Sequence, residues 1–107
     1  METNEILGEV IISEKEWEKN YSMKLEYYLI KEKMKEKNYG IGIKKTCIDN
    51  KEVYVEQKEL NGILNNESQT KELLNLLLAN KVTPIGLKET VIEIFKCNEA
   101  ILNYSNM

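Results

Sequence analysis

The side chains that could do chemistry in this chain are few and widely separated. The sequence has no histidine, all 15 basic residues are lysines, and Asp49 is the single aspartate among 18 acidic residues. Neither Cys47 nor Cys97 has a histidine that could activate its thiol. Acid and base chemistry would have to use strand glutamates, which are ordinarily only solvated; the candidates are Glu26, Glu52 and Glu56. The sequence therefore predicts no catalytic residue.

The sequence also has few residues arranged to bind a metal ion or a phosphate group. Zinc would need cysteine ligands at short spacing, and the two cysteines do not provide it. Asp49, Asn50 and Glu52 are typical of a hairpin turn and lack the alternating oxygen ligands of a calcium loop. Gly40 and Gly42 fall inside a strand pattern and not between a strand and a helix, so they form no phosphate loop. We expect no metal and no cofactor.

Charge is spread evenly along the chain. Lysines and glutamates interleave to give a net charge of −3, so no block of one sign offers a nucleic acid backbone a strong field. No apolar stretch approaches a membrane span, and the N-terminus does not have the pattern of a signal peptide. We therefore predict no nucleic acid partner, no membrane partner, a cytoplasmic location and reduced thiols. The richness in Lys, Asn and Ile without Arg is typical of a low-GC bacterium.

The elements that must position any site follow from a change of hydrophobic period. Apolar residues alternate as in strands up to Val55, and from Ser68 onward they recur at helical spacing. We predict strands over about Ile6–Ile12, Met23–Lys31, Tyr39–Lys44 and Val53–Val55. We predict one helix with Ser68 as its N-cap, and a second that follows Thr83 and Pro84 and runs towards Tyr104.

These elements predict an α+β fold in which a four-stranded antiparallel β-meander is covered on one face by two C-terminal α-helices. Residues 1–107 form a single domain, with only the last few residues allowed to fray. The face towards the helices is expected to carry the side chains Tyr39, Ile41, Ile43, Val53 and Val55. The helices would cover it with the stripes Leu73–Leu78 and Leu87–Phe95.

The opposite face of the third strand carries the most specific candidate site. Gly40 and Gly42 leave bare backbone there, and we expect Tyr28, Ile30 and Tyr54 of the neighbouring strands to share that side. One interpretation is structural, since tyrosine rings can lie over glycines and fill the gap. The other is a partner-binding surface, because exposed tyrosines are enriched at protein interfaces. The predicted partner-binding residues are Tyr28, Ile30, Gly40, Gly42 and Tyr54.

Three segments together resemble a small uncharacterised family, a domain of unknown function of clostridial and related spore-forming Gram-positive bacteria. They are Lys24–Lys31 (KLEYYLIK), Tyr39–Ile43 (YGIGI) and Val82–Phe95 (VTPIGLKETVIEIF), and the resemblance covers most of residues 6–96. The family often has a histidine where this chain has Gly86, so that loop is not a shared site. The resemblance implies a bacterial cytoplasmic protein and brings no activity, ligand or catalytic residue.

We accordingly expect a non-catalytic protein-binding or regulatory module that is not an enzyme. A helix-turn-helix-like DNA regulator is an alternative, although the exposed residues Lys88, Glu89, Glu93 and Lys96 of its second helix are balanced in charge. A small enzyme with a carboxylate, tyrosine and lysine site is the other alternative. The partner is expected to be a protein, and a homodimer could form through the terminal stripe Ile101, Leu102 and Tyr104.

Overall fold

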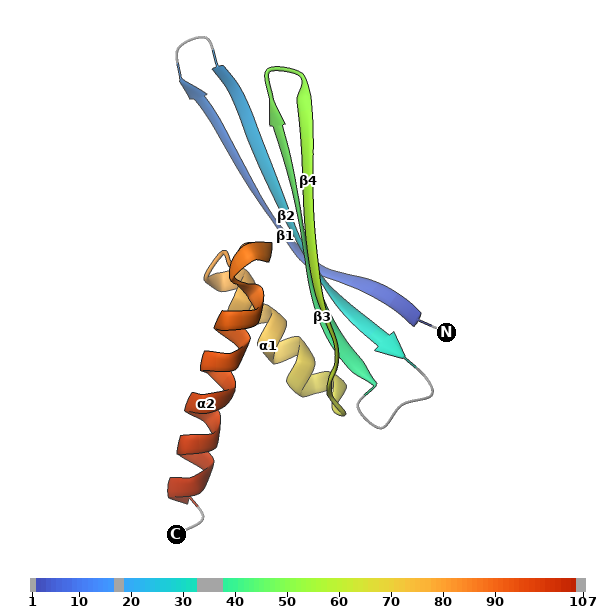
Figure 1. Ribbon diagram of the computed structural model, residues 1–107, viewed down its shortest axis with the longest axis vertical. Helices are drawn as coiled ribbons and strands as arrows, with labels where there is room; N and C mark the ends of the chain where they lie inside the picture. Colours follow the sequence, from blue (N-terminus) through green and yellow to red (C-terminus); the bar gives the residue numbers. More distant parts are fainter. Residues whose placement is uncertain (1, 17–18, 33–37, 106–107) are drawn as a thin grey trace.

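The computed structural model describes residues 2–16, 19–32 and 38–105, with side chains described for 4–6, 8–11, 22–32 and 38–97. The strands are β1 (Glu2–Glu16), β2 (Lys19–Glu32), β3 (Tyr39–Asp49) and β4 (Glu52–Leu64), followed by α1 (Glu67–Ala79), the 3₁₀ turn η1 (Pro84–Gly86) and α2 (Leu87–Ser105) (Figure 1). They form an antiparallel sheet in the order β1-β2-β3-β4. The α+β class, the antiparallel sheet and the two C-terminal helices are confirmed.

One face of the sheet packs against the helices and forms the core. Alternate residues of β2 and β3 point to this helix-side face, as the two-residue period of a strand requires. The fully buried strand side chains of the core are Leu25, Tyr27, Leu29, Ile41 and Ile43. The helices contribute Leu73, Leu74, Leu77, Leu87 and Val91.

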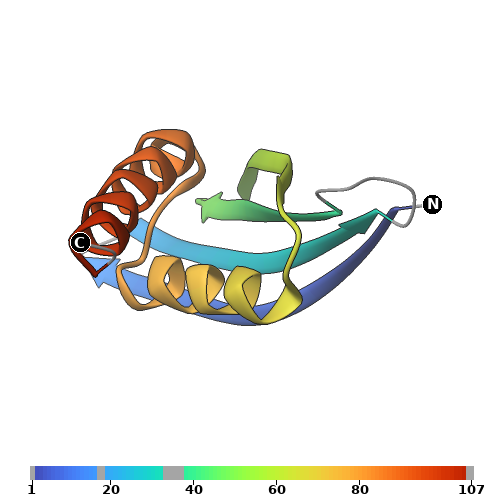
Figure 2. The ribbon, with the colours of Figure 1, turned by 90° about the horizontal axis from the view of Figure 1, so that it is seen from below.

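The two helices contribute unequally to this cover. Helix α1 contacts all four strands, and its Leu78 side chain lies so close to Gly8 of β1 that a Cβ there would approach Leu78 Cδ2 to 2.8 Å. Helix α2 buries Leu87 and Val91 in its first turns and then diverges from the sheet towards its C-terminal end (Figure 1; Figure 2, red). The predicted cover is therefore supplied by α1, η1 and the start of α2.

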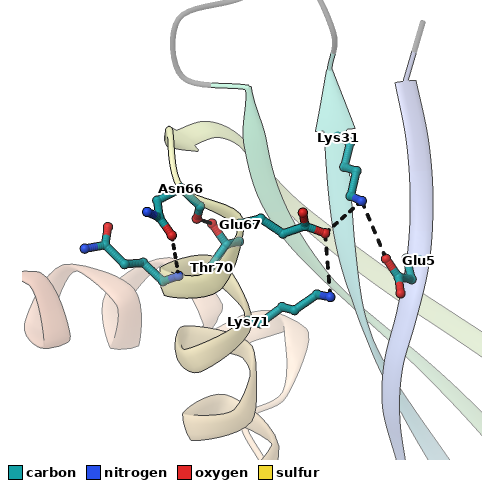
Figure 3. A network of polar contacts seen from close by, with 7 residues as sticks. Glu5, Lys31, Asn66, Glu67, Thr70 and Lys71 are labelled. Carbon is teal, nitrogen blue, oxygen red and sulfur yellow. Dashed lines mark hydrogen bonds and ion pairs between the residues drawn. The ribbon is translucent and has the colours of Figure 1, made fainter.

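Helix α1 begins two residues earlier than its sequence suggested. Asn66 is the N-cap, and its Oδ1 accepts a hydrogen bond of 2.9 Å from the backbone N–H of Gln69 (Figure 3). Ser68, the predicted cap, lies inside the first turn, because β4 continues to Leu64 and the helix follows almost at once. An asparagine carboxamide satisfies the free amides of a helix start as well as a serine hydroxyl does.

An ion-pair network fastens the start of α1 to the sheet. Glu67 Oε1 lies 2.8 Å from Lys31 Nζ and 3.6 Å from Lys71 Nζ, and Lys31 Nζ lies 3.9 Å from Glu5 Oε2 (Figure 3). The hydrogen bond from Lys31 lowers the pKa of the Glu67 carboxyl and raises the pKa of Lys31. The network thus connects β1, β2 and α1 at one end of the sheet.

The end of α1 is held by backbone hydrogen bonds and by a tyrosine. The amides of Lys81 and Val82 donate to the carbonyls of Leu78 and Leu77, each at 3.1 Å, which is the pattern of a Schellman motif with Lys81 at φ 52°. The hydroxyl of Tyr27 donates to the Val82 carbonyl at 2.8 Å. Strand β2 therefore fixes the position of the link between the helices.

The other half of the sheet extends past the helices. Figure 1 shows the β1–β2 and β3–β4 hairpins running beyond α1 and α2 at the top of the molecule. Every residue from Ile48 to Glu59 is exposed, and the molecule measures 58 × 34 × 18 Å. We call the part of the sheet formed by residues 11–16, 19–24, 46–49 and 52–57 the projecting half. At its inner end Met23 still packs against the core, and beyond that row all residues from Ile48 to Val55 are exposed.

Candidate protein-binding surface

Four of the five predicted partner-binding residues lie together on the face away from the helices, which we call the glycine face. In the ladder between β2 and β3, Tyr28 is opposite Gly42 and Ile30 is opposite Gly40. The ring of Tyr28 lies directly over Gly42, since a Cβ on Gly42 would overlap Cζ and Cε2 of that ring. The structure thus has the glycine–tyrosine packing of the structural interpretation, and Tyr28 is only 5% exposed.

The Tyr28 hydroxyl is held by two residues of β4. It donates a hydrogen bond to Glu59 Oε2 at 2.7 Å and accepts one from Gln57 Nε2 at 2.6 Å. The ring therefore crosses β3 over Gly42 and is fixed on the far side by β4. Tyr28 is positioned as a structural brace between β2 and β4, with little of its surface available to a partner.

Ile30 and Gly40 are also buried. The Ile30 side chain has no exposed surface, and Gly40 is covered by the backbone of β4. A Cβ on Gly40 would lie 2.5 Å from the Leu60 carbonyl oxygen and 2.9 Å from the Asn61 Cα. This close approach follows from a bulge in β4, where Gly62 has φ 61° and the ladder passes from Ile41–Leu60 to Tyr39–Leu64.

Tyr54 lies on the opposite face, so the prediction that it shares a side with Tyr28 is wrong. Tyr54 pairs with Cys47 and points to the helix side, where it is 54% exposed. The reason is the length of the β3–β4 turn. Its two residues, Asn50 and Lys51, have φ of 48° and 75°, and this turn pairs Asp49 with Glu52. Odd positions of β3 therefore share a face with even positions of β4.

The same parity places Val53 and Val55 on the glycine face, and the prediction that they join the helix-side core is wrong. Val53 is directly opposite Ile48, and Val55 is opposite Thr46 and diagonal to Ile48. Val53 is 61% exposed, Val55 is 55% exposed and Ile48 is 44% exposed. We call Ile48, Val53 and Val55 the distal patch. The sequence signal that could have located this patch is the length of the turn, because a two-residue turn fixes which residues of β3 and β4 face each other.

Charged and apolar side chains of β1 and β2 lie on one side of the distal patch. Thr46 is flanked across the glycine face by Lys24 of β2, which in turn pairs with Ile11 of β1, a residue 65% exposed. Lys24 Nζ lies 3.4 Å from Glu9 Oε1 and 3.9 Å from Glu26 Oε1. An apolar centre bordered by ion pairs is the usual anatomy of a surface that binds another protein.

A comparison with protein-family models places the chain in a known group. The model described as a family of unknown function (DUF6514) matches residues 8–96. The chain belongs to this family. No curated protein and no solved structure matches it. The matched residues include part of every strand and helix, and they end before the stripe Ile101, Leu102 and Tyr104, whose side chains lie outside those that the structure describes.

The family match does not distinguish between the alternative functions, so they are compared on the geometry of the structure. An open pocket lies between β4 and the start of α2, and it is lined in part by Lys58, Glu59, Lys88 and Glu89. All four of these side chains are exposed, so the pocket does not hold a carboxylate out of water as acid and base chemistry requires. Among the described residues, no three side chains of the types that bind metals gather into a ligand set.

The remaining chemical groups lie on the surface. On α2, Lys88, Glu89, Glu93 and Lys96 are all exposed and balance one another in charge, which is a poor surface for phosphates. Cys97 is an exposed thiol and Cys47 is half-buried opposite Tyr54. Over the part of the chain that the structure describes, no helix has the length and apolar character needed to cross a membrane.

Proposed function

We propose that this chain is a non-catalytic protein-binding or regulatory module of the bacterial cytoplasm, and that the projecting half of its sheet is the binding surface. The observation that carries the proposal is the distal patch. Val53, Val55 and Ile48 are neighbours in the ladder, and each exposes 44% or more of its surface. Monomeric proteins rarely leave large contiguous apolar patches in water, and those that do generally use them for binding.

The placement of the predicted residues supports this site over the one built on Tyr28. Tyr28, Ile30, Gly40 and Gly42 are buried, so they give a partner little to contact. The distal patch lies further along the same glycine face, beyond Lys44 and Glu26. The binding surface that we propose therefore keeps the predicted face and moves towards the β3–β4 turn.

The test is site-specific photo-crosslinking in a native host. A benzophenone amino acid is placed at Val53 in one variant and at Ile92, which is 42% exposed on α2, in a matched control. We expect the Val53 probe to give a discrete crosslinked protein and the Ile92 probe to give none. Equal labelling from both positions, or none from Val53, would contradict the proposal.

A second variant separates binding from folding. Val53→Lys places a charge in the distal patch at a position that is 61% exposed. The free energy of unfolding, measured by thermal denaturation, should therefore change by less than about 0.5 kcal/mol. The crosslink from a probe at Val55 should be lost in this variant. A crosslink that survives would show that the distal patch does not bind the captured protein.

A further inference from the structure

We infer that the projecting half binds a second copy of this chain, and that the two copies pair antiparallel through the outer edge of β4 about a two-fold axis at Val55. This inference rests on the proposed function, because it names a partner for the same surface. The two four-stranded sheets would then become one continuous sheet.

The first observation is that β4 is an open edge. It is the last strand in the order β1-β2-β3-β4, and from Glu52 to Leu60 it keeps a regular ladder with β3, its one partner among the described strands. All residues from Lys51 to Glu59 are exposed. A long, regular edge strand with exposed valines is a template for another strand, because its outer amides and carbonyls face solvent.

The other edge differs in ways that discourage pairing. Strand β1 has a bulge between Ile6 and Gly8, where Leu7 has no partner in the register with β2. Both edge strands carry charged residues, and they differ in where the ladder is interrupted. A bulge is one of the devices that protect natural edge strands, and β4 has its bulge only beyond Leu60. The comparison singles out β4 as the edge that accepts a strand.

Charge complementarity selects the register. A two-fold axis perpendicular to the sheet pairs one residue with itself, because opposite residues must point to the same face. With Val55 on the axis, Glu52 of each copy is opposite Lys58 of the other. Lys51, in the turn, is then brought beside Glu59 of the second copy.

Other positions of the axis are worse. An axis at Tyr54 places Glu52 opposite Glu56, and an axis at Glu56 or Lys58 places like charges against each other. An axis at Gln57 pairs Glu56 with Lys58 but extends the ladder into the bulge at Asn61. Only the register at Val55 pairs opposite charges within the straight part of β4 and keeps its apolar residues at the centre.

The apolar side chains agree with the same register. The perpendicular axis keeps the glycine faces of the two copies on one side of the joined sheet. Val55 then meets Val55 of the second copy on that face, with Val53 and Ile48 close by in each copy. The two distal patches become one apolar strip across the middle of the sheet. Tyr54 lies on the other face, opposite Glu56 of the second copy.

The charge pairing is tested by reversal. Association is measured by sedimentation for the full chain and for Glu52→Lys, Lys58→Glu and the double variant. Each single reversal creates two like-charge contacts, so we expect it to weaken association by about tenfold or more. The double variant restores both opposite-charge contacts and should recover most of the loss. Single and double variants that associate equally well would overturn the register.

The axis is tested by disulfide formation in a background with Cys47→Ser and Cys97→Ser. Val55→Cys places two thiols directly opposite each other, at a Cα separation of about 4.5 to 5.5 Å that a disulfide can span. Val53→Cys is the matched control, because residue 53 of each copy would be opposite Gln57 and about 13 Å along the strand from its equivalent. We expect a rapid crosslinked dimer from Val55→Cys only. Equal crosslinking from both positions would overturn the axis.

The outcomes separate this inference from the proposed function. A chain that stays monomeric at high micromolar concentration, while the Val53 probe still captures a host protein, overturns the inference and leaves the proposed function standing. Crosslinking of the Val53 probe to a product of twice the chain mass, together with recovery in the double variant, supports both. A monomer whose Val53 probe captures nothing overturns both.

Discussion

The same four strands run through two environments, and the contrast shows what the helices determine. Beside α1, the isoleucines Ile41 and Ile43 of β3 have no exposed surface, whereas Tyr54, on the same helix-side face but beyond the helix, is 54% exposed. Helix α1 has 13 residues and is about 20 Å long, while the 14 residues of β2 span about 46 Å. The helix can cover less than half of the strand, so apolar strand residues beyond it stay in contact with water.

The shape of the molecule reflects this mismatch. The radius of gyration is 16.2 Å, against about 13 Å for a compact domain of similar length. The covered half, by which we mean the rest of the sheet together with the helices packed on it, holds the core. It therefore supplies most of the stability, because burial of apolar surface is the main favourable contribution to folding. The projecting half adds surface and little burial, which suits a region that binds.

The largest expected effect comes from truncating matched isoleucines in the two halves. Ile41→Ala opens a cavity in the core and should lower the free energy of unfolding by about 2 to 5 kcal/mol. Ile48→Ala removes a side chain that is already 44% exposed and should cost less than about 1 kcal/mol. Denaturant unfolding at concentrations where the chain is monomeric measures both. Similar losses in the two variants would show that side chains of the projecting half contribute as much to the free energy of unfolding as those of the core.

The next effect concerns the buried part of the glycine face. Gly42→Ala forces a Cβ into the Tyr28 ring and should cost about 1 to 3 kcal/mol. In a Tyr28→Ala background the same change should cost much less, because the ring is gone. Gly40→Ala is the control, since its Cβ meets the backbone of Leu60 and Asn61. If Tyr28→Ala relieves Gly40→Ala equally, the ring is not the specific obstacle at Gly42.

Sequence pattern predicted the elements better than it predicted their faces. Alternation located β2 and β3, and helical spacing located α1 and the start of α2, because burial imposes those periods locally. The faces of Val53 and Tyr54 depended on the number of residues in the turn at Asn50 and Lys51, since a difference of one position reverses every side chain of a strand. That number is set by turn geometry, and the hydrophobic pattern of β4 fitted either choice.

The candidate site was predicted less well than the fold, for a related reason. The packing of Tyr28 on Gly42 was one of two interpretations of a single pattern, and pairing between neighbouring strands decided it. The distal patch is exposed because strand pairing places it on the glycine face, whereas α1 and the start of α2 pack on the opposite face. These are properties of tertiary packing, and the residues of β4 carry no sign of them.

A matched pair of tyrosines gives the third prediction. Tyr27→Phe removes the hydrogen bond to the Val82 carbonyl and should cost about 1 to 2 kcal/mol at neutral pH. Tyr54→Phe removes an exposed hydrogen bond to Glu52 and should change stability by less than about 0.5 kcal/mol. Thermal unfolding measures both changes. Equal losses would mean that the projecting half depends on its polar contacts as strongly as the covered half does.

Alkaline pH sharpens this comparison. Burial raises the pKa of Tyr27 from 10.0 to about 12, so the folded state holds its proton more tightly than the unfolded state. The resulting stabilisation is complete below pH 10 and is lost as the pH rises to about 12. The wild-type chain should therefore lose stability more steeply than Tyr27→Phe across this range. Parallel pH profiles would show that Tyr27 does not titrate with folding.

The smallest expected effects come from two lysines that hold positive φ, one in each half. Lys81 closes the Schellman motif of α1 at φ 52°, and Lys51 lies in the β3–β4 turn at φ 75°. Glycine adopts this conformation without the steric cost of a side chain, so Lys81→Gly should raise the free energy of global unfolding by about 1 kcal/mol. Lys51→Gly creates an Asn-Gly turn of the type that hairpins favour and should stabilise the projecting hairpin by a similar amount.

The two glycine variants should differ in where their stabilisation is seen. Lys81 is part of the covered half, so its replacement should slow hydrogen exchange throughout the core and raise the thermal midpoint. Lys51 lies in the turn of a hairpin with little burial, which can open without unfolding the core. Its replacement should slow exchange in the β3–β4 hairpin and leave the thermal midpoint almost unchanged. If Lys51→Gly raises the midpoint as much as Lys81→Gly does, the two halves unfold as one unit, and the contrast between them is one of exposure alone.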